Sequence, residues 1–225
     1  AVVGEILSGN VPSFSRKLKP LKINETINGE SYEVLFYTTS DYMAIGSDLD
    51  YLYIPMTPKT AQYLADTLKC SLPTKKIVDL VYSQADIKFS PQPIPPSDTM
   101  TTVPVFRQHT DSIRQQMKQL RIDGSVDKMR AGHKKDIIIS NTIYGTEHTS
   151  GRVVIYGWHL SEDNPIQQLY NGHNSEYADY SHGVRLLAQT AFVNGEPIRI
   201  STILRNPNLA ILMSDEGVIG RPYYP

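Results

Sequence analysis

A proline-rich stretch near the middle of the chain constrains the fold more than any other sequence feature. Five of the 15 prolines fall within residues 89–104. Each proline fixes its φ angle and removes a backbone hydrogen-bond donor, so we expect this stretch to be extended and not helical. Because neither flanking half looks self-sufficient, we interpret the stretch as a strap within a single domain, residues 1–225. A chain of this length can bury a sizeable core.

The N-terminal half predicts helices. Thr57 is a good N-cap, and Pro58 is tolerated at the first helical position. Residues 61–68 then place apolar side chains on one helical face. Residues 72–74 end this helix and begin another, so we expect a helical hairpin. A further helix is predicted at about 109–120, after the strap.

The C-terminal half is richer in strand patterns. Residues 136–140 and 152–156 contain continuous apolar runs, which are typical of central strands buried on both faces. Asn194-Gly195 separates two strand-like runs and indicates a hairpin turn. The sequence therefore predicts an α+β fold, a mainly antiparallel sheet with the helical hairpin and one further helix packed on it. The other expected elements are strands at 32–38, 51–54, 184–193 and 197–204 and a short helix near 208–213.

Composition narrows the class of protein. The formal net charge is −1, from 22 basic and 23 acidic side chains, whereas a duplex-binding protein normally carries a basic excess. No segment approaches the ~20 apolar residues that a membrane-spanning helix needs. Cys70 is the only cysteine, which excludes an intrachain disulfide. The chain starts at Ala1 and not at Met, as expected if a leader has been removed. We therefore expect a secreted or periplasmic protein that binds no nucleic acid and has no membrane span.

Ionisable side chains gather in the C-terminal half. Five of the six histidines lie between residues 133 and 182, and histidine is both a proton carrier near neutral pH and a common metal ligand. Residues 170–186 are the densest polar segment, and buried polar groups need partners. We interpret this segment as an active-site or ligand-binding loop, although a surface loop with a structural Asp179–Arg185 pair fits the same pattern.

This interpretation assigns a role to each candidate residue. His159, His173 and His182 are predicted to supply the general acid and base, and Asp179 to orient one imidazole. Lys134 and Lys135 precede a predicted central strand, where they could bind an anionic group. The predicted substrate-binding residues are Lys134, Tyr177, Tyr180 and Arg185.

Three other roles stay open. His159, His173, Asp179 and His182 have the side chains that zinc prefers, although no H-E-x-x-H pattern is present. Cys70 lies near a predicted helix N-terminus, which would activate a thiol, but a lone cysteine also serves as a small buried hydrophobe. A binding module would instead stack sugar rings or peptides on exposed aromatic side chains. Its candidates are Trp158, Tyr170, Tyr177 and Tyr180.

Several stretches of the chain resemble a family of uncharacterised exported bacterial proteins. The resemblance implies export and a single domain but no reaction. The stretches span nearly the whole chain: 9–14, 41–48, 56–58, 72–76, 134–136, 156–159 and 179–186.

A second, local likeness concerns Ser181-His182-Gly183-Val184-Arg185-Leu186. This stretch is similar to the catalytic segment of L,D-transpeptidases, in which Ser-His-Gly-Cys is followed by an apolar residue and arginine, after an upstream His-Gly. Here Val184 stands in the place of the nucleophilic cysteine, and His159 is followed by Leu160. If the fold is shared, acyl transfer of that kind cannot run from this position.

The sequence thus favours an exported hydrolase or lyase that acts on a cell-envelope or extracellular polymer, glycan or peptide, by His/Asp acid–base chemistry. The alternatives are a secreted glycan- or peptide-binding module and a zinc-dependent hydrolase. The enzyme hypothesis expects His159, His173, Asp179 and His182 to lie within hydrogen-bonding range of one another.

Overall fold

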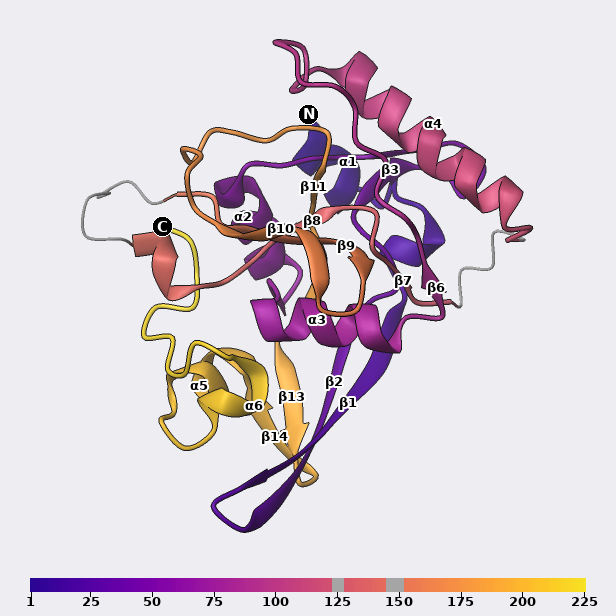
Figure 1. The fold of residues 1–225 in the computed structure, drawn as a ribbon. Coiled ribbons are helices and arrows are strands. Elements are labelled where there is room, and N and C mark those ends of the chain that lie inside the picture. Colours follow the sequence, from indigo (N-terminus) through magenta and orange to yellow (C-terminus); the bar gives the residue numbers. More distant parts are fainter. Residues whose placement is uncertain (123–127, 145–151) are drawn as a thin grey trace.

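A computed structural model describes residues 1–122, 128–144 and 152–225. Helices account for 28% of the chain and strands for 30%, so neither class dominates and the fold is α+β, as predicted (Figure 1). One hydrophobic cluster includes side chains from both sides of the proline-rich stretch, for example Phe36 and Leu64 before it and Ile137 and Leu204 after it. The two halves of the sequence therefore share a core.

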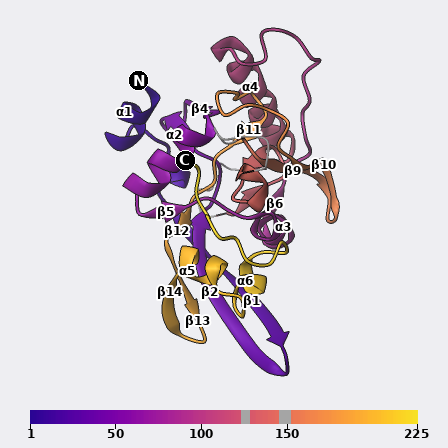
Figure 2. The ribbon, with the colours of Figure 1, turned by 90° about the vertical axis from the view of Figure 1, so that its left-hand side faces the viewer.

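The larger sheet is built around a long hairpin of β1 (Leu18–Ile27) and β2 (Glu30–Thr39), which projects from the rest of the molecule (Figures 1 and 2). The other edge of β2 pairs with two strands from the C-terminal part of the chain. All of its pairings are antiparallel. Its remaining strands are β5 (Cys70–Ser71), β12 (Leu187–Ala188), β13 (Thr190–Val193) and β14 (Glu196–Arg199).

A second sheet carries two of the predicted site residues, His159 and His182. Its order is β10-β9-β8-β11, and β11 runs parallel to β8 while the other pairs are antiparallel. Within the described residues there are also two small two-stranded sheets. The bounds are β8 (Lys135–Ile137), β9 (Ile155–Ser161), β10 (Asn164–Tyr170) and β11 (His182–Gly183), with β3 (Ala44–Gly46), β4 (Tyr51–Tyr53), β6 (Ile87–Lys88) and β7 (Arg130–Ala131) in the small sheets.

The two helices predicted before the strap are present. Thr57 caps α2 (Pro58–Thr67) by accepting a hydrogen bond from Thr60 N, and Thr74 caps α3 (Lys75–Gln84) in the same way. Both caps satisfy a backbone donor that the helix itself leaves unpaired. The connection between them contains β5, which the sequence did not predict because two residues give no periodicity.

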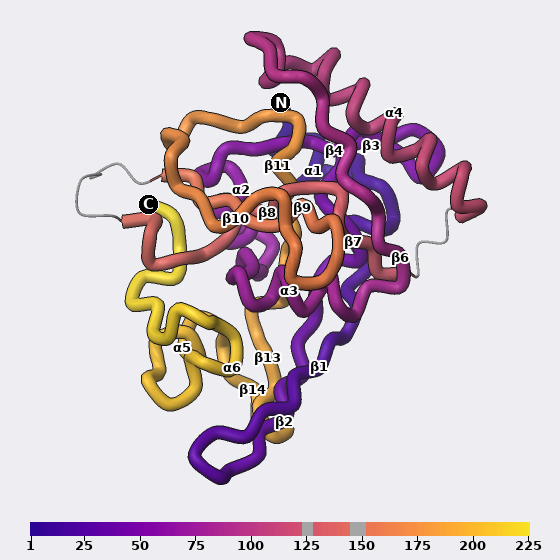
Figure 3. The backbone as a smooth tube through the Cα atoms, viewed as in Figure 1, coloured from indigo at the N-terminus to yellow at the C-terminus, as the bar shows by residue number. Residues whose placement is uncertain are grey.

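The helix after the strap begins earlier than predicted. It is α4 (Val103–Gln119), so Pro104 lies in its first turn, where the missing N–H removes no helical hydrogen bond. The strap itself runs from β6 to α4 (Figure 3). Ile94, at its centre, donates from its backbone N to Tyr180 Oη and accepts from the same hydroxyl. The strap is thereby tied to the C-terminal half.

The C-terminal hairpin is confirmed only in its first part. Asn194 and Gly195 have φ angles of 51° and 87°, as a tight hairpin turn requires. The predicted strand 197–204 was wrong beyond residue 199, because Ile200, Ile203 and Leu204 have helical spacing and their side chains are buried. The remaining helices are α1 (Val2–Leu7), α5 (Ile200–Arg205) and α6 (Ala210–Met213). Across the described ranges, no helix combines the length and apolar character needed to cross a membrane.

Candidate functional site

His159, one of the predicted acid–base residues, lies on β9 and points toward α3. Its Nε2 is 3.0 Å from Asp79 Oδ1, and its ring stacks on that of Tyr82, with 4.5 Å between ring centroids. Only 3% of the His159 side chain is exposed, against 34% for Asp79. The Asp79 carboxylate is therefore more exposed to solvent than the His159 imidazole. We call these two residues the His159–Asp79 pair.

Asp79 is held ionised by a set of donors. Tyr156 Oη donates to the same Oδ1 at 2.7 Å, and Lys75 Nζ donates to Oδ2 at 2.9 Å. Lys75 also donates to Asp215 at 2.8 Å. Burial raises the pKa of Asp79, but the hydrogen bonds from His159, Tyr156 and Lys75 outweigh burial and keep that pKa below its ordinary value. A charged carboxylate can fix the imidazole tautomer with the proton on Nε2.

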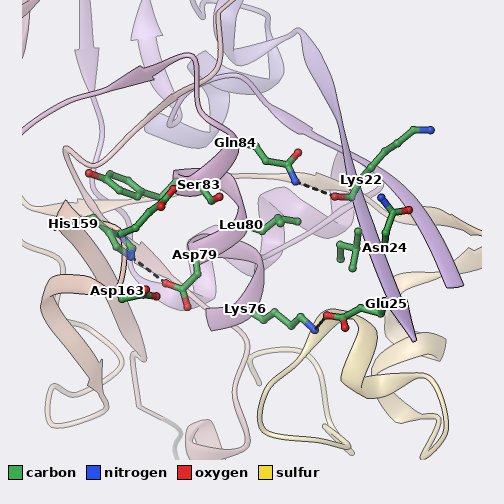
Figure 4. A pocket seen from close by; sticks show the side chains of 13 residues that line it. Lys22, Asn24, Glu25, Lys76, Asp79, Leu80, Ser83, Gln84, His159 and Asp163 are labelled. Atoms are coloured by element: carbon green, nitrogen blue, oxygen red, sulfur yellow. Dashed lines mark hydrogen bonds and ion pairs between the residues drawn. The ribbon is translucent and has the colours of Figure 1, made fainter. Parts of the chain in front are cut away.

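The His159–Asp79 pair lines an open cavity of about 590 Å³ (Figure 4). One wall comes from β1, another from α3, and a third from the turn between β9 and β10. The pair thus lies where a ligand has room to bind. The other polar side chains around the cavity are Lys22, Asn24, Glu25, Lys76, Tyr82, Ser83, Gln84, Glu162 and Asp163.

The other three predicted acid–base residues gather elsewhere, around the segment that joins β10 to β11. We call residues 171–181 the histidine loop. The ring centroids of His173 and His182 are 6.4 Å apart, and Tyr177 stacks on His173 at 4.1 Å. The negative charge of Asp179 acts on His182 and raises the pKa of its imidazole, against the larger effect of burial. The structure therefore brings His173, Asp179 and His182 together and places His159 apart from them, on β9 and facing α3.

Asp179 is occupied by hydrogen bonds within the loop. Its Oδ1 accepts from the backbone N of Ser181 at 2.8 Å and from Ser181 Oγ at 2.6 Å, and its Oδ2 accepts from Tyr177 Oη at 3.1 Å. His182 is 1% exposed, and neither of its ring nitrogens has a hydrogen-bond partner among the described residues. Burial lowers the pKa of His182 to about 4, although Asp179 opposes that effect. The imidazole is therefore neutral near pH 7.

Lys134 and Arg185, the predicted anion-binding residues, both lie in the interior. Lys134 Nζ donates to the backbone O of Tyr180 at 2.6 Å and lies 3.1 Å from His109 Nδ1. Burial lowers the pKa of Lys134 to about 7. The Arg185 guanidinium donates to the backbone oxygens of Thr39 and Arg130. Both side chains therefore donate to groups of the protein itself. Neither residue lines the cavity.

A network of buried charges is centred on Asp41, in the connection between β2 and β3. Asp41 is fully buried and accepts from His133 at 3.0 Å, Arg130 at 3.2 Å and Tyr53 at 2.7 Å. Burial raises the pKa of Asp41, but His133 and Arg130 more than offset it and hold that pKa well below the ordinary value. We assign this network a structural role because every carboxylate oxygen in it is paired within the protein.

The aromatic side chains proposed for a binding module are spread between surface and core. Trp158 and Tyr180 are 4% and 2% exposed, whereas Tyr170 is 43% exposed. A flat face made of all these rings is therefore not formed. Cys70 is half-buried, and burial raises the pKa of its thiol to about 11, which disfavours the reactive thiolate.

Two further predictions concern metal and the remaining histidine. No group of three or more His, Cys, Asp and Glu side chains is placed to hold a metal ion in the part of the chain that the structure describes. His148, one of the clustered histidines, lies outside the described residues.

Asp79 is the site residue that the sequence did not single out. It interrupts the otherwise apolar stretch of α3 between Val78 and Leu80, and a carboxylate beside buried positions needs a partner. That pattern could have indicated that Asp79 has a partner. It could not have identified His159 as the partner, because His159 lies 80 residues away in the sequence.

Comparison with models of protein families, with curated proteins and with solved structures gave no match. The resemblances to exported proteins and to L,D-transpeptidases therefore stay predictions.

Proposed function

We propose that the protein is an exported enzyme of hydrolase or lyase type in which the His159–Asp79 pair is the acid–base centre. The observation that carries this proposal is the 3.0 Å contact between His159 Nε2 and Asp79 Oδ1 at the wall of an open cavity. Of the four residues predicted for acid–base work, His159 is the one that lines this cavity.

The pair supports proton transfer in a simple way. Asp79 accepts from Nε2–H, so Nδ1 of His159 keeps a lone pair that can take a proton. The negative charge of Asp79 then stabilises the imidazolium that forms, as in other His–carboxylate pairs. In hydrolysis the proton comes from the attacking water and passes to the leaving group. In elimination it comes from the carbon next to the bond that breaks.

The lining of the cavity supports a polymer as substrate. Polar side chains extend from Lys22 and Asn24 on β1, past Gln84 on α3, to Asp163 in the β9–β10 turn. Such groups can hydrogen-bond hydroxyls and amides along an extended glycan or peptide chain. Export is the expectation from the sequence, and the cell-envelope or extracellular polymer follows from it.

The test is release of soluble fragments from purified cell-wall material and from a panel of glycans and peptides. We expect His159→Gln to lose about 10²-fold or more in kcat/KM, the contribution of one positioned acid–base group. His173→Gln is the matched control, since it removes a histidine from the histidine loop and leaves the cavity intact. Unsaturated sugar ends among the products would indicate elimination, and saturated ends hydrolysis.

Two results would reject the proposal. One is full activity in a folded His159→Gln variant. The other is loss in His173→Gln with activity retained in His159→Gln, which would move the active site to the histidine loop. A polymer that binds the wild-type protein without turnover would favour the binding-module alternative.

A further inference from the structure

We propose that the buried surface formed by Lys135, Trp158, His173 and His182 is a second site, separate from the cavity, which binds a small oxyanion such as a carboxylate or phosphate group. We call it the Lys135–His182 site. The proposal is independent of the catalytic role of His159.

The strands of the second sheet bring these residues together. β8 lies between β9 and β11, and Lys135 is the register partner of His182 on one side and of Gly157 on the other. Register partners on neighbouring strands project to the same face of a sheet. The Lys135 ammonium also lies 5.0 Å from the centre of the Trp158 ring. Three strands thus contribute to one small surface.

Unmet hydrogen-bonding capacity points to a ligand. His182 is 1% exposed, yet Nδ1 and Nε2 both lack partners among the described residues. The Trp158 Nε1–H is also buried and unpartnered there. Buried polar groups in proteins are nearly always paired with protein, water or a ligand. A neutral imidazole and an indole together offer two N–H donors, which is the capacity that a bound oxygen group would use.

The charges around the site favour an anion. Lys135 is half-buried and has no carboxylate within ion-pair distance in the described ranges. Lys135, His173 and Lys134 act on His182 as positive charges do and lower its pKa, whereas Asp179 acts in the opposite sense on both His182 and Lys135. The Asp179 oxygens are already engaged by Ser181 and Tyr177. The site therefore combines a lysine ammonium with N–H groups that lack acceptors in the described part of the chain, which suits an anion.

The covering side chains limit the size of the ligand. The stacked rings of His173 and Tyr177 lie over His182, with ring centroids 6.4 Å and 5.7 Å from it. Both covering residues are partly exposed, so solvent lies directly beyond them. This geometry suits a single oxyanion group, free or at the end of a larger molecule that extends past Tyr177.

The experiment is a titration of the full chain with inorganic phosphate and, separately, with acetate, followed by NMR of the histidine ring and tryptophan indole signals. The one tryptophan makes the indole N–H signal unambiguous. We expect saturable shifts of the His182 and Trp158 signals with at least one of the two anions at constant ionic strength. If only phosphate gives saturable shifts, the site is specific for phosphate groups. If both anions do, the site accepts oxyanions in general.

Matched variants locate the binding. Lys135→Gln should weaken anion binding at least tenfold, Lys135→Arg should retain it, and Lys22→Met, which removes a cavity lysine, should leave it unchanged. The proposal is overturned if neither anion gives a saturable shift, or if chloride gives the same shift. It is also overturned if Lys22→Met abolishes anion binding while Lys135→Gln retains it. Binding of zinc without binding of either anion would overturn it too. Should Lys135→Gln fail to fold, Trp158→Phe serves instead, since it removes the unpartnered indole N–H and should weaken the anion-dependent shift of the His182 signal. An unchanged affinity in that variant would overturn the proposal as well.

Discussion

Trp158 and His159 are consecutive residues of β9, and their side chains project to opposite faces of the sheet. His159 reaches Asp79 on α3 at 3.0 Å, while the Trp158 ring lies near His109 of α4 and near Tyr180. Trp158 has a φ angle of 61°, which interrupts the regular strand at this point. One short segment therefore contributes both to the His159–Asp79 pair at the cavity and to the proposed Lys135–His182 site.

Asp41 should be essential for stability. Asp41→Ala leaves Arg130 and His133 as buried groups without their carboxylate partner, and breaking a buried ion pair in this way costs about 3–5 kcal/mol. Urea denaturation measures the change in the free energy of unfolding. Asp98→Ala, at an exposed position, is the control and should change it by less than about 0.5 kcal/mol. Equal, small effects of both substitutions would contradict the assigned role of the buried network.

Gly183 should tolerate no side chain. A Cβ atom there would lie 2.6 Å from Tyr42 Cδ1 and 2.7 Å from Lys134 Cβ, inside a packed interior. We expect Gly183→Ala to lower the free energy of unfolding by about 1–3 kcal/mol, the usual effect of overpacking. Gly220→Ala, where an added Cβ meets nothing within 4 Å, should be close to neutral in the same denaturation assay. A neutral Gly183→Ala would show that Tyr42 moves aside freely.

Lys134 should make stability depend on pH in the alkaline range. Burial lowers the pKa of Lys134 to about 7 in the folded chain, from an ordinary value of 10.5. Between these two pH values the unfolded chain binds more protons than the folded chain, so stability rises as pH rises. The expected gain from pH 7 to 9 is up to about 2 kcal/mol, since one pKa unit corresponds to about 1.4 kcal/mol. Urea denaturation at several pH values measures this gain, and Lys134→Met should remove it. If the wild-type protein and Lys134→Met showed the same rise in stability with pH, another titrating group would be its cause and the prediction would be wrong.

Cys70 should have no part in the reaction. Burial raises the pKa of its thiol to about 11, so little thiolate exists near neutral pH. If the proposed function holds, Cys70→Ser is therefore expected to keep the full activity of the wild-type protein in the fragment-release assay. Alkylation of the native protein by iodoacetamide at pH 8 should be slow. An inactive but folded Cys70→Ser variant would restore the thiol as a candidate nucleophile.

The parts of the fold that the sequence predicted well are those with strong local patterns. Thr57-Pro58 and Thr74 mark helix starts, and Asn194-Gly195 marks a hairpin, because caps and tight turns are set by a few neighbouring side chains. Strands of two residues, such as β5 and β11, carry no period and depend on partners far along the chain. The helix over 200–205 was mistaken for strand because branched side chains fit either element.

The candidate site shows the same division between local and distant information. His173, Tyr177, Asp179 and His182 come together because they lie within ten residues of one another on one loop and the strand after it. The contact between His159 and Asp79 joins segments 80 residues apart, and nothing local selects that carboxylate over others. Lys134 and Arg185 were predicted to bind substrate, but the structure buries both side chains. Their burial depends on the packing of several elements at once, which no local sequence pattern indicates.

The most direct test of the acid–base pair is a double-mutant cycle on kcat/KM with Asp79→Asn, His159→Gln and the combined variant. If Asp79 acts through His159, the combined variant should lose no more activity than His159→Gln alone, since residues that act as a unit are strongly non-additive. Losses that multiply in the combined variant would contradict the pair, and so would full activity in His159→Gln.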